Sequence, residues 1–177
     1  AGLPVRIPGS LSPDEIRNSR TRFVPVISSA RAASVILRAW QRRIQIPDAF
    51  VIEGPMAGGH LGFKRHELDD PAFKLERLLP QVRNVLAPYE NASGKHISVV
   101  VGGGVFTGAD IHRFLQLGAD GVQMATRFVA TDECDADKRF KEAYLRCNPE
   151  DLTIIDSPVG LPGRAIRNQF LDDVTSG

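Results

Sequence analysis

The chain has 177 residues, of which 42% are hydrophobic and 24% charged, and its formal net charge is +1. This composition is typical of a soluble globular domain with one well-buried core. A charge so close to zero gives no electrostatic basis for binding a nucleic acid or an anionic membrane, and no apolar run approaches the roughly 20 residues of a membrane span. Cys134 and Cys147 are too few for a disulfide framework, so we expect free thiols in a reducing, cytoplasmic compartment.

Short apolar runs alternate with longer amphipathic stretches along most of the chain. The pattern predicts strands at residues 23–27, 49–53, 96–101 and 121–128, and a short fifth strand at 152–155. It predicts helices at residues 31–43, 74–86 and 135–147, and a shorter one from Thr107 or Gly108 up to Gly118. Residues 157–164 are rich in Pro and Gly, so we expect no regular structure there.

Each predicted helix has one apolar face that we expect to pack against a sheet. The residues on these faces are Ala33, Ile36, Leu37, Trp40, Leu75, Leu78, Leu79, Val82, Leu86, Ile111, Phe114, Leu115, Phe140, Ala143, Tyr144 and Cys147. Pro25 lies inside the first predicted strand and indicates either a strand at the edge of its sheet or a strand that has lost a neighbour, because proline cannot donate a ladder hydrogen bond.

The order of these elements predicts an α/β fold with a parallel sheet covered by helices. Strands and helices alternate with short connections, and the strands are near-continuous apolar runs. A complete eight-stranded β/α barrel needs roughly 250 residues, whereas this chain supplies four clear βα units. Part of a (β/α)8 TIM barrel and a complete doubly wound domain are therefore the two alternatives.

Two strand ends carry small residues that suit a phosphate group. Gly102, Gly103 and Gly104 follow one predicted strand, and Ala125 and Thr126 lie near the end of the next. Neighbouring parallel strands that end in bare backbone N–H groups beside a helix N-terminus can bind a phosphate. The alternative is that these glycines only permit close packing between strand and helix. The pattern is not the dinucleotide-binding G-x-G-x-x-G.

A glycine-rich loop after the strand at 49–53 carries a histidine. His60 follows Gly58 and Gly59, which would let a flat ligand lie against the backbone. A histidine in this setting suits proton abstraction near neutral pH, and the alternative is an ordinary surface-loop residue. No spacing of His, Cys and carboxylate residues predicts a metal site.

Glu53, Ser28 and Ser29 also lie at predicted strand ends. Glu53 is either a catalytic acid or base, or a structural acceptor for loop N–H groups, and we favour the structural role because a buried carboxylate needs such partners. Ser28 and Ser29 either line a cavity or cap the following helix.

These segments together resemble the nitronate monooxygenase (2-nitropropane dioxygenase-like) family of FMN-dependent β/α-barrel enzymes. The resemblance is carried by residues 53–62, 103–105, 118–128 and 157–164, which occur in the family's order and spacing. It covers most of residues 20–170, and the segments are specific only in combination.

The resemblance implies a TIM barrel that binds FMN and oxidises alkyl nitronates or nitroalkanes with O₂. His60 matches the position of the catalytic base, and Gly58 and Gly59 would lie near the isoalloxazine ring. The positions that would hold the FMN ribityl phosphate are Gly103, Gly104, Gln123, Met124, Ala125 and Thr126.

The resemblance also implies that the chain is the C-terminal half of such an enzyme, with the N-terminal half of the barrel expected in a parent protein. Residues 1–20 would then be a loop from an earlier βα unit, 21–150 the half-barrel, and 151–177 a C-terminal extension. Two other functions remain open. One is an FMN-dependent reductase similar to enoyl-acyl-carrier-protein reductase II, which uses NAD(P)H, and the other is a non-catalytic half-barrel that binds a phosphate ligand.

Overall fold

A computed structural model describes residues 14, 20–41, 46–158 and 160–176. Most of the predicted loop at 1–20 therefore lies outside the described residues. The helices and strands are β1 (Val26–Ile27), α2 (Ala30–Gln41), β2 (Ala49–Glu53), β3 (Gly59–His60), α3 (Leu75–Ser93), β4 (Ser98–Gly102), α4 (Gly108–Gln116), β5 (Gly121–Gln123), α5 (Thr126–Val129), α6 (Lys138–Arg146), β6 (Leu152–Asp156), β7 (Pro162–Ile166) and α7 (Gln169–Ser176). Short 3-10 turns lie at Arg65–Glu67, Pro71–Phe73 and Pro149–Asp151.

Four strands form the predicted parallel sheet, in the order β1-β2-β4-β5. The sheet follows the chain order of four βα units, as the sequence predicts, and β1 lies at its edge, as Pro25 indicates. β1 is only two residues long because Pro25 has no N–H, although its carbonyl still accepts a hydrogen bond from Val51 N–H at 3.0 Å.

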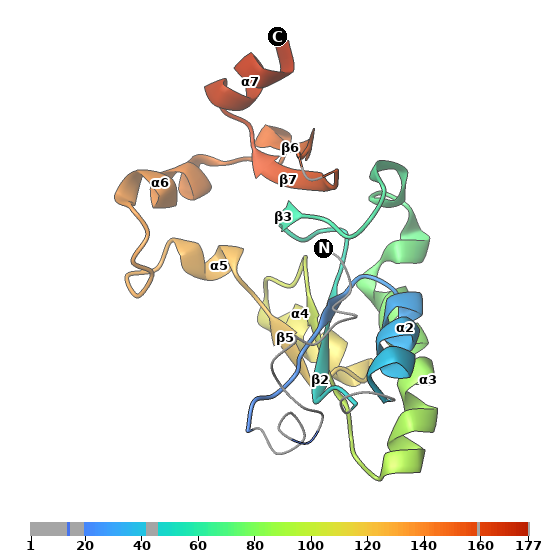
Figure 1. Ribbon diagram of the computed structural model, residues 1–177. Coiled ribbons are helices and arrows are strands. Elements are labelled where there is room, and N and C mark those ends of the chain that lie inside the picture. The colour runs from blue at the N-terminus through green and yellow to red at the C-terminus, as the bar shows by residue number, and fades with distance from the viewer. Residues whose placement is uncertain (1–13, 15–19, 42–45, 159, 177) are drawn as a thin grey trace.

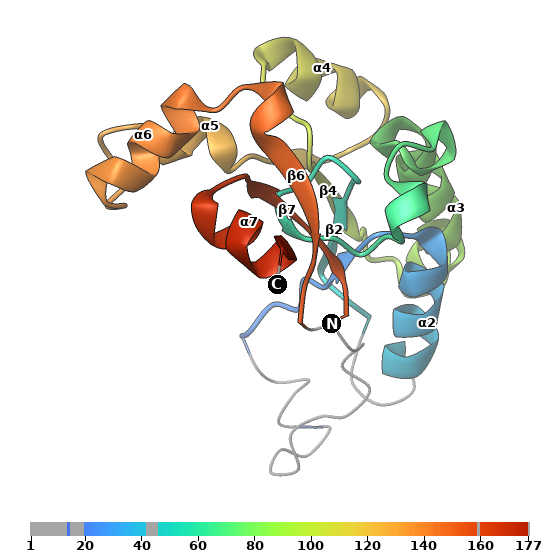
Figure 2. The same ribbon diagram turned by 90° about the horizontal axis from the view of Figure 1, so that it is seen from above.

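Helices α2, α3 and α4 surround one side of this sheet in an arc (Figures 1 and 2). Of the predicted apolar faces, those of α2 and α3 are buried at every named position, and Phe114 of α4 is buried as well. Ile52 and Val101, which are neighbours across the sheet, are fully buried on the helix side. On the opposite side Val26 is 57% exposed, and this is the side that faces the interior of a closed β/α barrel.

The apolar face predicted for 135–147 is not buried. α6 has no buried residue, Phe140 is 51% exposed, and the helix lies away from the parallel sheet in both views. Phe140 packs instead on Tyr144 of the same helix, with ring centroids 5.1 Å apart. Leu115 of α4 is also exposed, contrary to the prediction. Amphipathic periodicity thus identified the helices but not which of them the sheet covers.

The strand predicted at 121–128 is wrong beyond Gln123. The ladder ends at the Gly102–Gln123 pair because β4 turns away at Gly103, whose φ is +88°. Without a neighbouring strand to pair with, the chain turns at Ala125 and forms the short helix α5.

Residues 157–164 contain regular structure, contrary to the prediction. β7 begins at Pro162 and pairs with both β6 and β3 in a second, antiparallel sheet of order β3-β7-β6. The Pro162 ring costs no ladder bond at this first position, and its carbonyl accepts from Leu61 N–H at 2.8 Å. The segment 151–177 is therefore joined to the glycine-rich loop of the preceding βα units.

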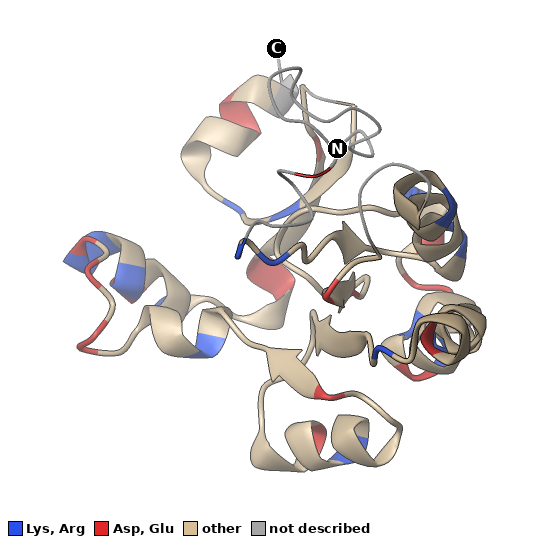
Figure 3. Ribbon diagram, turned by 60° about the horizontal axis from the view of Figure 1, so that its bottom comes forward, with Lys and Arg blue, Asp and Glu red and all other residues tan. Residues whose placement is uncertain are grey.

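Charged residues of both signs are distributed over the helices (Figure 3). Asp120, at the start of β5, accepts hydrogen bonds from Val99 N–H at 2.7 Å, from His96 at 3.0 Å and from the Arg83 guanidinium. Burial alone would raise the pKa of Asp120, but these bonds outweigh it and hold the pKa below its usual value. None of the described helices is long and apolar enough to cross a membrane.

We expect Asp120→Asn to lower the free energy of unfolding at pH 7 by about 1–2 kcal/mol, because a hydrogen-bonded carboxylate is lost. A depressed carboxyl pKa stabilises the fold above the unfolded pKa of about 3.9, and this stabilisation is lost as pH falls through the lower folded pKa. The difference between variant and parent should therefore shrink below about pH 4. Urea denaturation at several pH values measures it, with the exposed Asp69→Asn as control. An unchanged difference at pH 3 would contradict this assignment.

Candidate functional site

The C-terminal ends of β2, β4 and β5 lie side by side and bring the predicted site residues to one edge of the sheet. Glu53, Gly102 and Gln123 are direct neighbours across the three strands. The carboxyl end of a parallel β/α sheet is where such folds bind ligands.

Close packing requires glycine at the end of β4. Gly103 has φ +88°, and a Cβ added there would lie 2.9 Å from Ala57 N and 3.0 Å from Gly54 O. A Cβ on Gly104, at φ +91°, would lie 3.0 Å from Met56 Cβ. The packing alternative therefore explains both glycines, which hold the end of β4 against the turn after β2.

The glycines beside His60 are in open space, unlike the closely packed glycines at the end of β4. A Cβ added to Gly58 or Gly59 would meet no atom within 4 Å, and both residues are exposed. Arg164 of β7 holds the preceding turn, because its guanidinium donates to Pro55 O at 2.9 Å and Ala57 O at 3.1 Å. An open backbone surface on a fixed turn can accept the face of a flat ligand.

His60 lies on β3, and its backbone pairs with Gly163 of β7. Its Nε2 atom is 2.7 Å from the hydroxyl of Ser157, which is 9% exposed at the end of β6. The C-terminal hairpin therefore fixes the histidine from both the backbone and the side chain.

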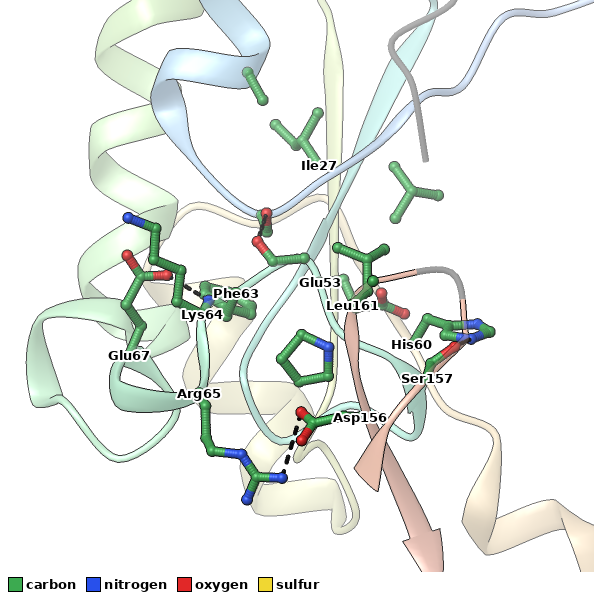
Figure 4. A pocket seen from close by; sticks show the side chains of 16 residues that line it. Ile27, Glu53, His60, Phe63, Lys64, Arg65, Glu67, Asp156, Ser157 and Leu161 are labelled. Carbon is green, nitrogen blue, oxygen red and sulfur yellow. Dashed lines mark hydrogen bonds and ion pairs between the residues drawn. The ribbon is translucent and has the colours of Figure 1, made fainter. Parts of the chain in front are cut away.

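A cavity of about 810 Å³ opens beside His60, between the ends of β1 and β2 and the β6–β7 hairpin (Figure 4). Its size is in the range of small-molecule sites. In Figure 4, His60 and Ser157 lie next to each other, Leu161 lies between them and Glu53, and Arg65 pairs with Asp156 at 3.5 Å. The lining residues are Val26, Ile27, Ser28, Ala32, Glu53, His60, Gly62, Phe63, Lys64, Arg65, Glu67, Asp156, Ser157, Gly160, Leu161 and Pro162.

Ser28 and Ser29 fulfil both predicted roles. Ser29 Oγ accepts from Ala32 N–H at 3.2 Å and caps α2, while Ser28 lines the cavity. Ser28 Oγ also donates to Gly62 O at 2.8 Å, and a Cβ on Gly62 would lie 2.6 Å from that hydroxyl. This contact joins the end of β1 to the loop that carries His60.

Glu53 is half-buried in the wall of the same cavity, and this burial raises the pKa of its carboxyl group. No hydrogen bond from a loop N–H to this carboxylate is found among the described residues, so the structural role that we favoured lacks its donors. An ionised carboxylate without such donors is costly to bury.

We expect Glu53→Gln to raise the melting temperature at pH 7.5 and to change it little at pH 4. A raised carboxyl pKa means that Glu53 favours the fold below its unfolded pKa of about 4.3, and that this contribution is lost as pH rises through the folded pKa. The neutral amide removes that pH-dependent cost. Thermal unfolding followed by circular dichroism tests this, with exposed Glu150→Gln as the matched control. A lower melting temperature at pH 7.5 would show that the carboxylate stabilises the fold.

The residues predicted to hold a phosphate lie at the same sheet edge but do not line the His60 cavity. Gly104, Gln123, Ala125 and Thr126 are exposed. Ala125 lines a second cavity of about 580 Å³ together with α5 and Cys134. Within the described residues, no cluster of His, Cys, Asp and Glu suits a metal ion.

Sequence reasoning missed the roles of Ser157 and Arg164. Both lie in the segment expected to be irregular, and their partners are 97 and 107 positions away, at His60 and Ala57. A prediction that β3 pairs with β7 would have brought these residues to the site. The sequence does not predict β3 as a strand, because it is two residues long and contains a glycine.

Successive βα units with a cavity at the carboxyl edge of a parallel sheet are the arrangement found in β/α-barrel proteins. The sequence model of the nitronate monooxygenase family matches residues 12–176, and the chain belongs to this family. A probable nitronate monooxygenase from Staphylococcus aureus strain Newman is 30% identical over 129 residues, which cover 72% of this chain and 34% of that protein.

Several solved structures resemble the chain, and two of them are compared below. FabK from Thermotoga maritima aligns with 99% of this chain and 47% of its own, with a TM-score of 0.72 and 27% identity. A nitroalkane oxidase from Streptomyces ansochromogenes aligns with 92% of this chain and 44% of its own, with a TM-score of 0.66 and 28% identity. The chain thus has the fold of a partial (β/α)8 barrel and spans about a third of the length of the curated relative.

Proposed function

We propose that the chain is part of an FMN-dependent oxidoreductase that oxidises alkyl nitronates and nitroalkanes with O₂. The observation that carries this proposal is His60, which lines a cavity at the carboxyl edge of the sheet and follows an open glycine backbone. Membership of the nitronate monooxygenase family and the likeness to a nitroalkane oxidase support it.

The residues at the sheet edge fit a flavin. The open backbone at Gly58 and Gly59 can accept the face of the isoalloxazine ring, which a side chain would obstruct. Exposed residues at the ends of β4 and β5, including Gly104 and Thr126, would hold the ribityl phosphate. When bound, the flavin supplies the electron transfer between the nitronate and O₂.

The contribution of this chain is proton transfer and positioning. His60 removes the acidic proton next to the nitro group of a neutral nitroalkane and holds it as an imidazolium. Ile27 and Leu161 in the cavity wall exclude water around the alkyl group. β1 and β5 are at the edges of the described sheet, so we propose that the other strands of a closed barrel complete the site.

We also propose a cytoplasmic location for the protein. The free thiols of Cys134 and Cys147 support this proposal.

Gly58→Ala tests the cofactor assignment. We expect this variant to keep the parent's melting temperature, because the added methyl group meets no atom, and to weaken FMN binding at least about tenfold by separating the ring from the backbone. A titration of FMN followed between 300 and 550 nm measures this binding, with Gly108→Ala at the start of α4 as the control, since a Cβ there also meets open space. Equal FMN affinity in the parent and Gly58→Ala would remove this loop from the flavin site.

A second candidate is an NAD(P)H-dependent reductase similar to enoyl-acyl-carrier-protein reductase II, which has the same Ala-Gly-Gly-His-x-Gly segment as residues 57–62. The two candidates use the same flavin but different electron donors. Rapid loss of the flavin absorbance on anaerobic addition of NAD(P)H would favour the reductase.

A further inference from the structure

Ser157 is the described side chain that forms a hydrogen bond with the ring of His60. The distance from His60 Nε2 to Ser157 Oγ is 2.7 Å, and Ser157 is 9% exposed, whereas His60 is exposed to the cavity. Figure 4 shows the hydroxyl group next to the imidazole ring, on the wall formed by the β6–β7 hairpin. Glu53 and Asp156 line the same cavity, but neither forms a hydrogen bond with His60.

The backbone around Ser157 holds the hydroxyl in place. Ser157 N–H donates to Leu161 O at 3.1 Å, and Gly160 N–H donates back to Ser157 O at 2.8 Å. Pro162, which follows Leu161, accepts a hydrogen bond at 2.8 Å from the N–H of Leu61, the residue after His60. The histidine on β3 and the serine after β6 are therefore both held by backbone hydrogen bonds to β7 or to the residue before it.

This contact decides which ring nitrogen is available for chemistry. A neutral imidazole has one N–H and one lone pair. If Ser157 donated to Nε2, the proton would be on Nδ1 and His60 would have no free lone pair. If Nε2–H donates to Ser157 Oγ, Nδ1 keeps its lone pair and can accept a proton, and after proton uptake Ser157 still accepts from Nε2–H.

We propose that Ser157 is a positioning residue that holds His60 in the Nε2–H tautomer, so that Nδ1 is the proton acceptor. The proposal rests on the proposed function of His60 as a base. It assigns the C-terminal hairpin a part in the site, since the hairpin supplies the hydroxyl that fixes the imidazole.

Nitrogen-15 NMR of the histidine rings tests the tautomer without any flavin. The His60 signals are identified by their absence in His60→Asn, and the variants compared are Ser157→Ala, Ser157→Thr and, as a matched control on the surface of α2, Ser34→Ala. We expect the Nε2–H tautomer in the parent, in Ser157→Thr and in the control. In Ser157→Ala, the ratio of Nε2–H to Nδ1–H should fall at least about fivefold, which is the effect of losing one hydrogen bond. An Nδ1–H tautomer in the parent, or an unchanged ratio in Ser157→Ala, would overturn the proposal.

Kinetics of the flavin-loaded protein separates this proposal from the proposed function. Ser157→Ala should lower kcat for a neutral nitroalkane about tenfold with little change in KM, and Ser157→Thr should restore it, while turnover of the preformed nitronate stays near the parent value. Loss of turnover on both substrates in Ser157→Ala, with no restoration in Ser157→Thr, would show a structural role only. If His60→Asn itself leaves nitroalkane turnover unchanged, the proposed function fails, whatever the tautomer.

Discussion

His60→Asn should lower the turnover of a neutral nitroalkane by at least about 100-fold, while the turnover of the preformed nitronate falls much less. The nitroalkane must lose a proton before it can be oxidised, and a positioned base typically contributes 10²–10⁴-fold to such a step. The nitronate has already lost that proton. Asparagine keeps the size and polarity of the side chain but cannot accept a proton. Initial rates of O₂ consumption with each substrate measure the effect.

The matched control for this variant is His66→Asn, because His66 is exposed in the neighbouring 3-10 turn and does not line the cavity. It should behave like the parent with both substrates. If His60→Asn loses the same factor with nitroalkane and nitronate, His60 acts in binding or folding and not as the base.

Gly103→Ala should be the most destabilising of the glycine substitutions in the strand-end loops, with a loss of about 3 kcal/mol in the free energy of unfolding. Alanine at φ +88° is strained, and its Cβ would lie 2.9 Å from Ala57 N. That residue is held in place because its N–H donates to Gly54 O and its carbonyl accepts from Arg164. Movement of Ala57 would disturb the loop that carries His60, so bound flavin should be lost as well.

A graded series separates backbone strain from the steric clash. Gly118→Ala has strain alone, since φ is +98° and no atom lies within 4 Å of the added Cβ, so it should cost about 1 kcal/mol. Gly58→Ala has neither and should be close to neutral. Urea denaturation gives the three values, and a Gly103→Ala protein as stable as Gly118→Ala would show that the turn can move away.

Periodicity predicted the helices and the parallel sheet because each of these elements buries one regular face. The α3 prediction shows how far this works: all five apolar positions are buried, but the helix continues past Pro88 to Ser93, seven residues beyond the predicted end at Leu86. The helix end is set by Gly94, whose φ is +66° and whose N–H donates to Glu90 O. A glycine cap is a local signal, and the prediction overlooked it here.

Tertiary pairing explains the parts that the sequence did not reveal. Thr126 belongs to a helix rather than a strand because the partner strand β4 stops at Gly102. Pro162 begins a strand because β3 and β6 lie on either side of it. His60 could be singled out from its glycine neighbours, whereas Ser157 and Arg164 could not, because their partners come from a distant loop.

Anaerobic absorbance spectroscopy tests the proposed activity most directly. The protein, both as the 177-residue chain and within any longer natural chain that contains it, is loaded with FMN and mixed without O₂ with a preformed alkyl nitronate or with NAD(P)H. We expect the bands of the oxidised flavin to disappear with the nitronate, to persist with NAD(P)H, and to return when O₂ is admitted. Bands that persist with the nitronate and disappear rapidly with NAD(P)H would contradict the proposed function and favour the reductase.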